Sequence, residues 1–574
     1  MFRKNEQHRQ KSFFSGEDLL PAKLRKRLRM SWAEAFYELI LCRLDETIFA
    51  PLYSENASRP NVPVNVLVAL SVLKAGFGWS DEVLHEQVCF NLQVRHALGL
   101  HDLRTEIFTL RTLYNFRRRV KEYEEETGID LMKKVFEQIN DEHIELVALA
   151  TGWERMDSSQ LLSNLAKMNR LELLVAVVQA VHQQLPESVD GDWAERWSTY
   201  LEGRPHQVCY KIPSRETEEH LETIGRGLCA VERILVEEAP ESSVLALVRR
   251  VLEEQYKQGA DGTVRLRPGE EVPADSLQSP HDPDATFRVK GGVVFRGGYV
   301  VNVSETADPE NPVQLITDVQ VEPNCTDDAV LMEQSLDDQA ERDIKVEQVT
   351  TDGGYTGLRG EQACEKHDVE LRTTRMRGGR SAPDKWGWEE YRWIVNDQGI
   401  PSRVTCPQGC TADLGPGKAE GAFIARFNRE CCAGCPFFTN KCRVQDRPRV
   451  GPTLYVRART IKVAQHRQSL HPEDTSIRVL VESTIRSLKR GFPNNKLPVR
   501  GLTRTRTMIY GAALMVNVRR LHQYFRQRAQ EASEDLASSL SSARKLICGC
   551  VSDANRHIRR HLVPPAQPAV LLPA

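Results

Sequence analysis

The segment from Asp474 to Arg490 constrains the fold of this chain most, because after Asp474 it sets a single carboxylate among several cations on what is predicted to be one helix. Arg478 and Glu482 are four residues apart, and Lys489 lies seven residues further on. At about 3.6 residues per turn these three side chains fall on one stripe. An adjoining stripe of isoleucine, valine and leucine indicates that the helix packs against a core. The segment therefore predicts a packed helix that presents one acid within a basic stripe.

Charge is segregated locally around Glu482. Between positions 478 and 506 Glu482 is the only acid, and the basic residues are Arg478, Arg486, Lys489, Arg490, Lys496, Arg500, Arg504 and Arg506. The whole chain has 77 Lys and Arg against 79 Asp and Glu, so it is not a basic protein. A solvated helix face is one reading of such a stripe. A lone acid among bases instead favours a carboxylate that holds a metal against the phosphates of a nucleic acid.

Two upstream segments offer partners for Glu482, and each is expected to present an Asp at the end of an extended stretch. The sequence Glu154-Arg-Met-Asp157 follows an apolar run, and β-branched residues lead from Val346 into Asp352 and a glycine pair. A glycine pair after a strand lets the backbone turn tightly and approach a ligand. Each aspartate alone reads as a turn or cap residue. Since Mg²⁺ is usually held by one or two protein carboxylates, the combination with Glu482 favours a metal site.

The order of elements between these motifs predicts the fold class. The stretches 293–303 and 315–321 are rich in valine, isoleucine and tyrosine and read as strands between the two aspartates. A ribonuclease H-like core has the same order of elements: a strand with Asp, two strands, a helix, a strand with Asp and a late helix with Glu. We therefore expect an α/β ribonuclease H-like catalytic core with an all-helical N-terminal domain and two insertions.

The three motifs together resemble those of the DDE transposases encoded by bacterial insertion sequences. In one large group of that family the last motif reads Tyr-x2-Arg-x3-Glu-x6-Lys. Arg478, Glu482 and Lys489 match it, whereas Thr475 stands where the family has tyrosine. The resemblance spans most of residues 15–525 and implies three catalytic, metal-binding carboxylates: Asp157, Asp352 and Glu482.

The resemblance implies metal-dependent DNA strand cleavage and strand transfer with two Mg²⁺ ions, or Mn²⁺ in their place. Asp157 would bridge the ions, with Asp352 and Glu482 each completing one of them. The implied partners are the terminal inverted repeats of a transposon and its target DNA, bound by a homodimer. Arg478, Lys489 and Arg490 would contact DNA. A nuclease of the same fold and an inactive DNA-binding relic stay open as alternatives.

Residues 1–140 are expected to form a helical N-terminal DNA-binding domain. Apolar spacing predicts helices over 62–76, 80–98 and 106–125. The resemblance implies that this domain recognises the transposon end, and helix-turn-helix geometry would place a cluster of arginines on the duplex. A bundle that packs on the core or dimerises is the alternative. The arginines are Arg117, Arg118 and Arg119.

The motifs also divide the rest of the chain. We expect the core to comprise 141–160, 285–365 and 470–528, and a helix at 508–528 should close it. Between these segments we expect a mostly helical insertion at 161–284, with helix from Leu161, and an insertion with a cysteine cluster at 366–469. A flexible tail is expected at 529–574. No apolar run approaches the about 18 residues of a membrane span, and the N-terminus lacks a signal-peptide apolar region. We therefore expect a cytoplasmic, nucleoid-associated bacterial protein that does not contact membranes.

The second insertion carries a cluster of cysteines. In a reducing compartment clustered thiols are more often metal ligands than disulfides, and four thiolates form a closed tetrahedral zinc site. The best quartet is Cys406, Cys432, Cys435 and Cys442, with Cys410 as the rival of Cys406. Free thiols are the alternative. The sequence thus predicts a structural Zn²⁺ site in addition to the Mg²⁺ site.

Overall fold

The computed structural model describes residues 2–9, 15–54, 61–185, 187–259, 264–290, 292–376, 384–396 and 400–531. The chain forms two compact units. Unit 1 comprises Met1–Ala150, Ser159–Thr326 and Thr484–Ala574, and unit 2 comprises Thr151–Ser158 and Asp327–Ser483. Strand β1 (Trp153–Leu162) and helix α17 (Thr475–Leu488) therefore belong partly to each unit.

The first part of unit 1 is helical, as the sequence predicts. Its α-helices are α1 (Ala22–Arg29), α2 (Trp32–Phe36), α3 (Val64–Phe77), α4 (Asp81–Phe90), α5 (Leu92–Ala97), α6 (Leu110–Thr127) and α7 (Leu131–Leu146). The single helix expected over 80–98 is wrong, because Asn91 starts a new helix. Its side chain accepts hydrogen bonds from the N–H groups of Gln93 and Val94 and so caps α5.

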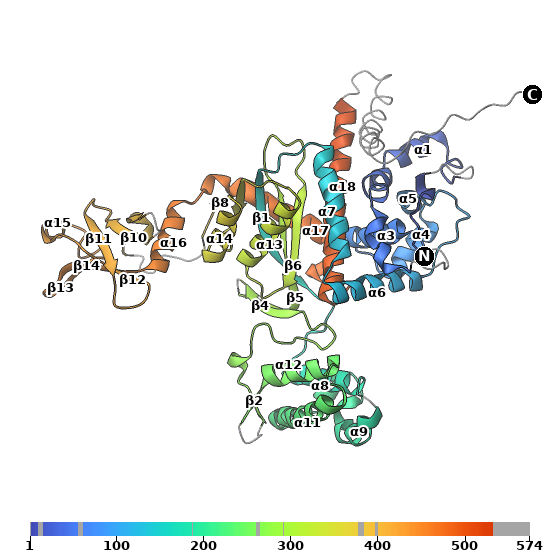
Figure 1. The fold of residues 1–574 in the computed structure, drawn as a ribbon, viewed down its shortest axis with the longest axis horizontal. Helices are drawn as coiled ribbons and strands as arrows, with labels where there is room; N and C mark the ends of the chain where they lie inside the picture. Colours follow the sequence, from blue (N-terminus) through green and yellow to red (C-terminus); the bar gives the residue numbers. More distant parts are fainter. Residues whose placement is uncertain are drawn as a thin grey trace, which may run out of the picture. The chain divides into compact units, whose positions relative to one another are not determined.

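Helix α18 (Leu502–Glu531) packs against α3, α7 and strand β6 (Ile316–Pro323), all within unit 1 (Figure 1). Small residues allow the close contact with α3, since a Cβ at Gly76 would lie 2.3 Å from Met515 Cγ. The buried Asn517 amide donates to Asn140 Oδ1 at 2.7 Å and to Ile316 O at 2.9 Å. The sequence predicts a helix at 508–528 that closes the core, and the structure confirms it with an earlier start.

Strands on both sides of β1 form the centre of the α/β part. In unit 1, β4 (Thr286–Lys290), β5 (Val293–Thr306) and β6 are antiparallel, and β5 is the neighbour of β1. In unit 2, β1 pairs in parallel with β7 (Gln348–Thr351), and β7 pairs in parallel with β8 (Glu370–Thr373). Helices α13 (Asp328–Glu341) and α14 (Leu358–Lys366) supply part of a core that includes Met156 and Tyr355.

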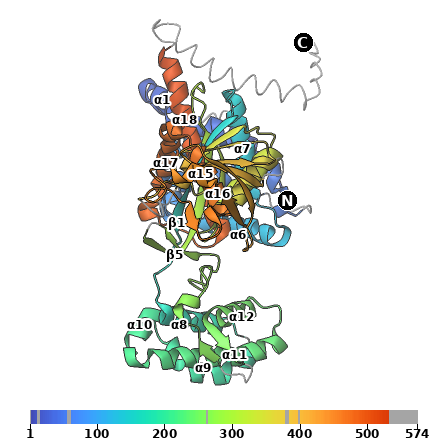
Figure 2. The ribbon, with the colours of Figure 1, turned by 90° about the vertical axis from the view of Figure 1, so that its left-hand side faces the viewer.

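A helical insertion follows β1. Its helices α8 (Arg170–His182), α9 (Glu187–Leu201), α10 (Pro205–Tyr210), α11 (Thr217–Glu238) and α12 (Ser243–Gln255) surround an apolar core of their own (Figures 1 and 2). The expectation that helix begins at Leu161 is wrong, because β1 runs on to Leu162. Asn169 then caps α8 in a reciprocal pair with Glu172, which fixes the start of the helix.

The second insertion, in unit 2, is rich in strands. An antiparallel sheet has the order β13-β14-β12-β11-β10-β9. Its strands are β9 (Arg392–Val395), β10 (Pro401–Thr405), β11 (Thr411–Pro416), β12 (Ala422–Arg426), β13 (Gln445–Arg447) and β14 (Gly451–Arg457), with helices α15 (Arg429–Ala433) and α16 (Ala458–Gln468). Buried Tyr391, Trp393 and Leu454 belong to a separate small core.

Of the expected tail, α18 includes residues up to Glu531, and the remainder lies outside the described residues. In the described part of the chain, no helix has the length and apolarity needed to cross a membrane.

Candidate active site

Asp157 lies in the part of β1 that belongs to unit 2. Its carboxylate is 15% exposed, and its Oδ1 accepts a hydrogen bond of 2.8 Å from the Ser158 N–H. Because side chains alternate along a strand, Ser158 points to the opposite, buried side. The sequence analysis expected Asp157 at the end of an extended stretch. This is wrong, because β1 continues for five residues to Leu162.

Asp352 follows directly after β7, as the sequence predicts. Its Oδ1 accepts a hydrogen bond of 2.7 Å from the Gly354 N–H. Neither residue of the glycine pair has room for a side chain. A Cβ at Gly353 would lie 2.6 Å from Arg375 O, and one at Gly354 would lie 2.8 Å from Asp352 Oδ1. The glycine pair therefore allows a tight turn that presents Asp352, which agrees with the sequence-based reading.

A buried tyrosine lies close to several carboxylates. Burial raises the pKa of Tyr355 well above its ordinary range, and the negative charges of Asp157, Asp328 and Asp352 raise it further. Tyr355 therefore stays protonated, and its side chain forms a hydrogen bond with that of Ser158. Two of the three predicted site residues thus lie around one phenol ring, together with an acid that the sequence analysis did not select.

That additional acid is Asp328, the first residue of α13. It is 5% exposed, and its Oδ1 accepts a hydrogen bond of 2.7 Å from Ser158 Oγ. Its Oδ2 lies 2.8 Å from the position that a Cβ of Gly354 would take. The sequence contains a weak signal, an Asp-Asp pair before an apolar helix. Such a pair reads as a cap, and only Asp327 has that role in the structure.

Glu482 lies on α17 and is joined to Asp157 by an arginine. Arg478 donates from Nη2 to Glu482 Oε1 at 2.7 Å and from Nη1 to Asp157 Oδ2 at 3.4 Å. The Arg478 side chain is 16% exposed, and that of Glu482 is 47% exposed. These contacts, together with the surroundings of Tyr355, bring the three predicted carboxylates into one region of unit 2. Within the described residues, their oxygens do not all lie within 4.8 Å of one another.

Lys489, the last residue of the predicted stripe, belongs to unit 1. Its ammonium donates to Ser159 Oγ at 2.6 Å and to Gln160 O at 2.7 Å. Lys489 thus holds the second half of β1, a role that the sequence analysis did not predict. Arg486 and Arg490 on the same segment are exposed. Arg506, the last base of the stripe, forms ion pairs with Glu322 and Glu124, which fixes it within unit 1.

The three predicted DNA-binding arginines of α6 differ in their surroundings. Arg117 is 23% exposed and lies 2.8 Å from Asp81, which also lies 2.8 Å from Lys74. Arg118 is 61% exposed, and Arg119 is also exposed. Arg117 therefore ties α6 to α3 and α4. Of the two exposed side chains, Arg118 pairs with Glu122 on the same helix at 2.8 Å, and Arg119 lies over the Tyr53 ring.

The cysteines of the second insertion separate into a pair and a quartet. Cys410 forms a disulfide with Cys431. Burial raises the pKa of the Cys432 thiol to about 11, and the neighbouring Cys442, Cys406 and Cys435 raise it as well. The four predicted zinc ligands thus lie near one another, and the rival Cys410 has a different partner. Among the described residues, the four sulfur atoms do not form a group within 4.8 Å.

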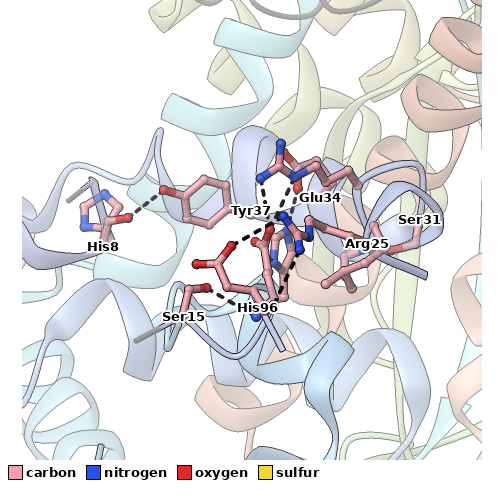
Figure 3. Close-up of polar contacts among 12 residues, drawn as sticks. His8, Ser15, Arg25, Ser31, Glu34, Tyr37 and His96 are labelled. Atoms are coloured by element: carbon pink, nitrogen blue, oxygen red, sulfur yellow. Dashed lines mark hydrogen bonds and ion pairs between the residues drawn. The ribbon is translucent and has the colours of Figure 1, made fainter. Parts of the chain in front are cut away.

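A second polar cluster lies among the N-terminal helices (Figure 3). His96 Nε2 lies 2.5 Å from Glu34, and its Nδ1 lies 2.8 Å from Glu17. Burial opposes the protonation of His96, but the hydrogen bonds with the two glutamates outweigh it and raise its pKa to about 9. The hydrogen bond with His96 lowers the pKa of Glu17 to about 2, and Glu17 also pairs with Arg29 at 3.1 Å. We interpret this cluster as an ion-pair network.

In comparison with known proteins, two segments of the chain match family models of transposase domains. Residues 27–119 match a family model described as "Transposase domain (DUF772)", and residues 405–522 match one described as "Transposase DDE domain". The second match includes Arg478 and Glu482 and the predicted cysteine quartet, whereas Asp157 and Asp352 lie outside both matches. No curated protein matches the chain.

Among solved structures, one similar chain comes from the cryo-EM structure of a piggyBac transposase synaptic complex with hairpin DNA. The match covers 93% of this chain and 82% of that chain at 9% identity, with a TM-score of 0.28. A likeness of this size supports no inference about geometry. The two family matches and the arrangement of residues in unit 2 therefore carry the functional interpretation.

Proposed function

We propose that the chain is a DDE transposase of the bacterial insertion-sequence type, which binds the element's ends and catalyses DNA strand cleavage and strand transfer. The observation that carries this proposal is the meeting of distant motifs in unit 2. Arg478 joins Glu482 to Asp157, and Asp328 contacts both Ser158, the neighbour of Asp157, and Gly354 in the turn that holds Asp352. The match of residues 405–522 to a transposase DDE model supports the same chemistry.

The fold we propose for the catalytic core is ribonuclease H-like. The parallel pairing of β1 with β7 and of β7 with β8 supports it, as do the antiparallel β4, β5 and β6 and the helix α13 that follows them. We keep the proposed domain boundaries of 1–140 for the N-terminal domain, 141–160, 285–365 and 470–528 for the core, 161–284 and 366–469 for the insertions, and 529–574 for the tail.

Asp157, Asp352 and Glu482 are the residues that would hold the divalent ions. Their donor set consists of carboxylate oxygens, which suit Mg²⁺ or Mn²⁺. When bound, two such ions supply an activated water or 3′-hydroxyl and charge stabilisation for the leaving oxygen. The protein orients this donor set. The Ser158 N–H holds one oxygen of Asp157, the Gly354 N–H holds one of Asp352, and Arg478 holds Glu482.

DNA contacts are proposed on two elements. Arg478, Lys489 and Arg490 lie on or just after α17, and Arg118 and Arg119 lie exposed on α6. Arg117 would support the latter pair through its bond to Asp81. The partners we propose are the terminal inverted repeats and target DNA, with a homodimer in the synaptic complex, acting in the bacterial cytoplasm at the nucleoid.

Thr475 replaces the tyrosine of the related motif, and its hydroxyl donates to Pro472 O at 2.6 Å at the start of α17. The replacement therefore has a local structural role at the start of α17. A nuclease that cuts without joining would use the same carboxylates. Only the joining of a 3′-end to target DNA separates the two activities.

A plasmid excision and integration assay tests the proposal, with the DNA that flanks this gene as donor and Asp352→Asn as the comparison. We expect joined products with the wild type and none with the variant. Cleaved but unjoined donor DNA would indicate a nuclease. If purified wild-type protein binds the ends but neither cuts nor joins them with Mn²⁺, the protein is a DNA-binding relic and the proposal is wrong.

We also propose that Cys406, Cys432, Cys435 and Cys442 hold a structural Zn²⁺ ion. Thiolate sulfur is the donor that zinc prefers in closed structural sites, and the donor set is complete without Cys410. The gathering of the other three thiols around Cys432 supports this set. The apolar core of the insertion is small, and small cores often need a metal ion or disulfides for stability. A zinc ion would supply such stabilisation here.

A further inference from the structure

Asp328 is an acid whose position helix capping does not explain. Asp327 is the N-cap residue of α13, and its Oδ1 accepts a hydrogen bond of 3.1 Å from the Ala329 N–H. Asp328 is 5% exposed and lies one residue further on. Because burial of a carboxylate is costly unless it is hydrogen-bonded or paired, its contacts within unit 2 indicate what the side chain does.

The two oxygens of Asp328 face the two segments that carry predicted catalytic residues. Oδ1 accepts the hydrogen bond of 2.7 Å from Ser158, the neighbour of Asp157 on β1. Oδ2 approaches Gly354, where an added Cβ would lie 2.8 Å from this oxygen and also 2.8 Å from Asp352 Oδ1. One carboxylate thus lies between the β1 motif and the turn after β7.

Ser158 links these segments further. Its side chain also forms a hydrogen bond with that of Tyr355, the residue that follows the glycine pair. Its backbone N–H donates to Asp157 at 2.8 Å. A displacement of Ser158 would therefore change both the position of Asp157 and that of the turn that presents Asp352.

We propose that Asp328 is a positioning residue of the active site, which holds Ser158 and thereby fixes Asp157 relative to the Asp352 turn. The inference rests on the proposed function for its catalytic consequence. Groups that orient metal ligands typically change metal affinity or activity by about 10–100-fold when they are removed. The hydrogen bond needs an acceptor at this position, and an asparagine side chain also supplies one.

The test compares five variants of the full chain: Asp328→Ala, Asp328→Asn, Ser158→Ala, the double variant Ser158→Ala with Asp328→Ala, and Asp327→Ala. The last is the matched control, because it removes the adjacent cap but leaves the contact with Ser158. Hydrogen exchange of peptides covering 154–160 and 350–357 reports on positioning. Mn²⁺ binding, measured by electron paramagnetic resonance with the value for Asp352→Asn subtracted, reports on the ligands.

We expect Asp328→Ala and Ser158→Ala to accelerate exchange in both peptides and to weaken Mn²⁺ binding and cleavage about 10–100-fold. The double variant should be no worse than Ser158→Ala alone, since both changes break the same contact between Ser158 and Asp328. Asp328→Asn should stay within about threefold of the wild type. Asp327→Ala should lower the melting temperature without changing Mn²⁺ binding.

Unchanged exchange in Asp328→Ala would overturn the positioning role, whatever the activity of the protein. An Asp328→Asn variant as inactive as Asp352→Asn would also overturn it, because the charge and not the hydrogen bond would then matter. If the wild type neither binds Mn²⁺ at this site nor cleaves DNA, the proposed function fails. The exchange data still decide whether Asp328 holds the two segments together.

Discussion

Two clusters of acids in this molecule differ in what neutralises them. Among the N-terminal helices, Glu17 and Glu34 meet the His96 imidazolium, and Glu17 also meets Arg29. In the candidate active site, carboxylates share Arg478 and accept hydrogen bonds from a hydroxyl group and backbone N–H groups. In the first cluster two cations match two acids, which stabilises the fold. In the second cluster four acids share one arginine and otherwise accept hydrogen bonds from neutral donors, which would leave negative charge available for an exchangeable cation.

The largest effect that this comparison predicts concerns Glu482→Gln. The variant should lose metal-dependent cleavage by more than about 100-fold, because removal of a ligand costs more than removal of a group that orients one. Its melting temperature should change little, since the carboxylate is 47% exposed. Cleavage and end binding are measured on the same protein preparation. Cleavage at the wild-type rate would refute the assignment, and loss of end binding would show that Glu482 has a different role.

The cysteine quartet is a third kind of cluster. We expect its disruption to remove bound metal and to lower stability. Changing Cys432 and Cys435 together to serine should remove one equivalent of zinc and unfold the strand-rich insertion, because structural zinc binding is coupled to folding. Cys410→Ser is the control, since it breaks the disulfide but spares the quartet. Elemental analysis and limited proteolysis measure the two effects. Wild-type protein without zinc would contradict the proposal.

The His96 network should contribute stability in a defined pH range. The folded-state pKa of His96, about 9, is above its ordinary 6.5, so its contribution is complete below pH 6.5 and is lost as the pH rises through 9. The pKa of Glu17, about 2, is below its ordinary 4.5, so its contribution is complete above pH 4.5 and is lost as the pH falls through 2. Both contributions are complete between pH 4.5 and 6.5.

We therefore expect His96→Gln to lower the free energy of unfolding by about 2–3 kcal/mol at pH 6, and by progressively less as the pH approaches 10. Urea unfolding of both proteins across this pH range measures the difference. The exposed pair of Lys121 with Glu125, 2.9 Å apart, is the control and should contribute less than about 1 kcal/mol at any pH. A difference that does not vary with pH would show that His96 acts through packing alone.

The smallest predicted effect separates the partly buried Arg117 from the exposed Arg118 and Arg119 on the same helix. Arg118→Ala with Arg119→Ala should weaken end binding and reduce its salt dependence by about one unit of slope per lost phosphate contact. Arg117→Ala should instead lower the melting temperature, because it leaves Asp81 with only Lys74. Binding titrations at several salt concentrations separate the two. Equal loss of binding in Arg117→Ala and in the double variant would contradict the assignment.

The sequence predicted the elements that carry local signals. The apolar stripe of α17, the β-branched run before Asp352 and the glycine pair each depend on neighbouring residues, and the structure contains all of them. The break at Asn91 was missed because helical periodicity continues across it. The side chain of Asn91 caps the next helix, and this local contact outweighs the apolar pattern.

Asp328 could not be selected from the sequence for a different reason. Its role depends on a hydrogen bond from Ser158, which precedes it by 170 residues, and on its contact with Gly354, which lies in the turn after β7. In sequence it is one acid beside a good cap residue. The role of Lys489 was also hidden, because its bonds to Ser159 and Gln160 join segments more than 300 residues apart. Long-range contacts of this kind leave no periodic signal.

The packing of α18 against α3 has a consequence for how the protein is made. Nearly all residues of α3 are buried, and Met515 of α18 fits against Gly76. At about 5–20 residues per second, the ribosome finishes α18 roughly 20–90 s after α3. During this time the apolar surface of α3 lacks its partner. We expect nascent chains to need chaperone protection, and fragments that end before Leu502 to be degraded before they can act on DNA.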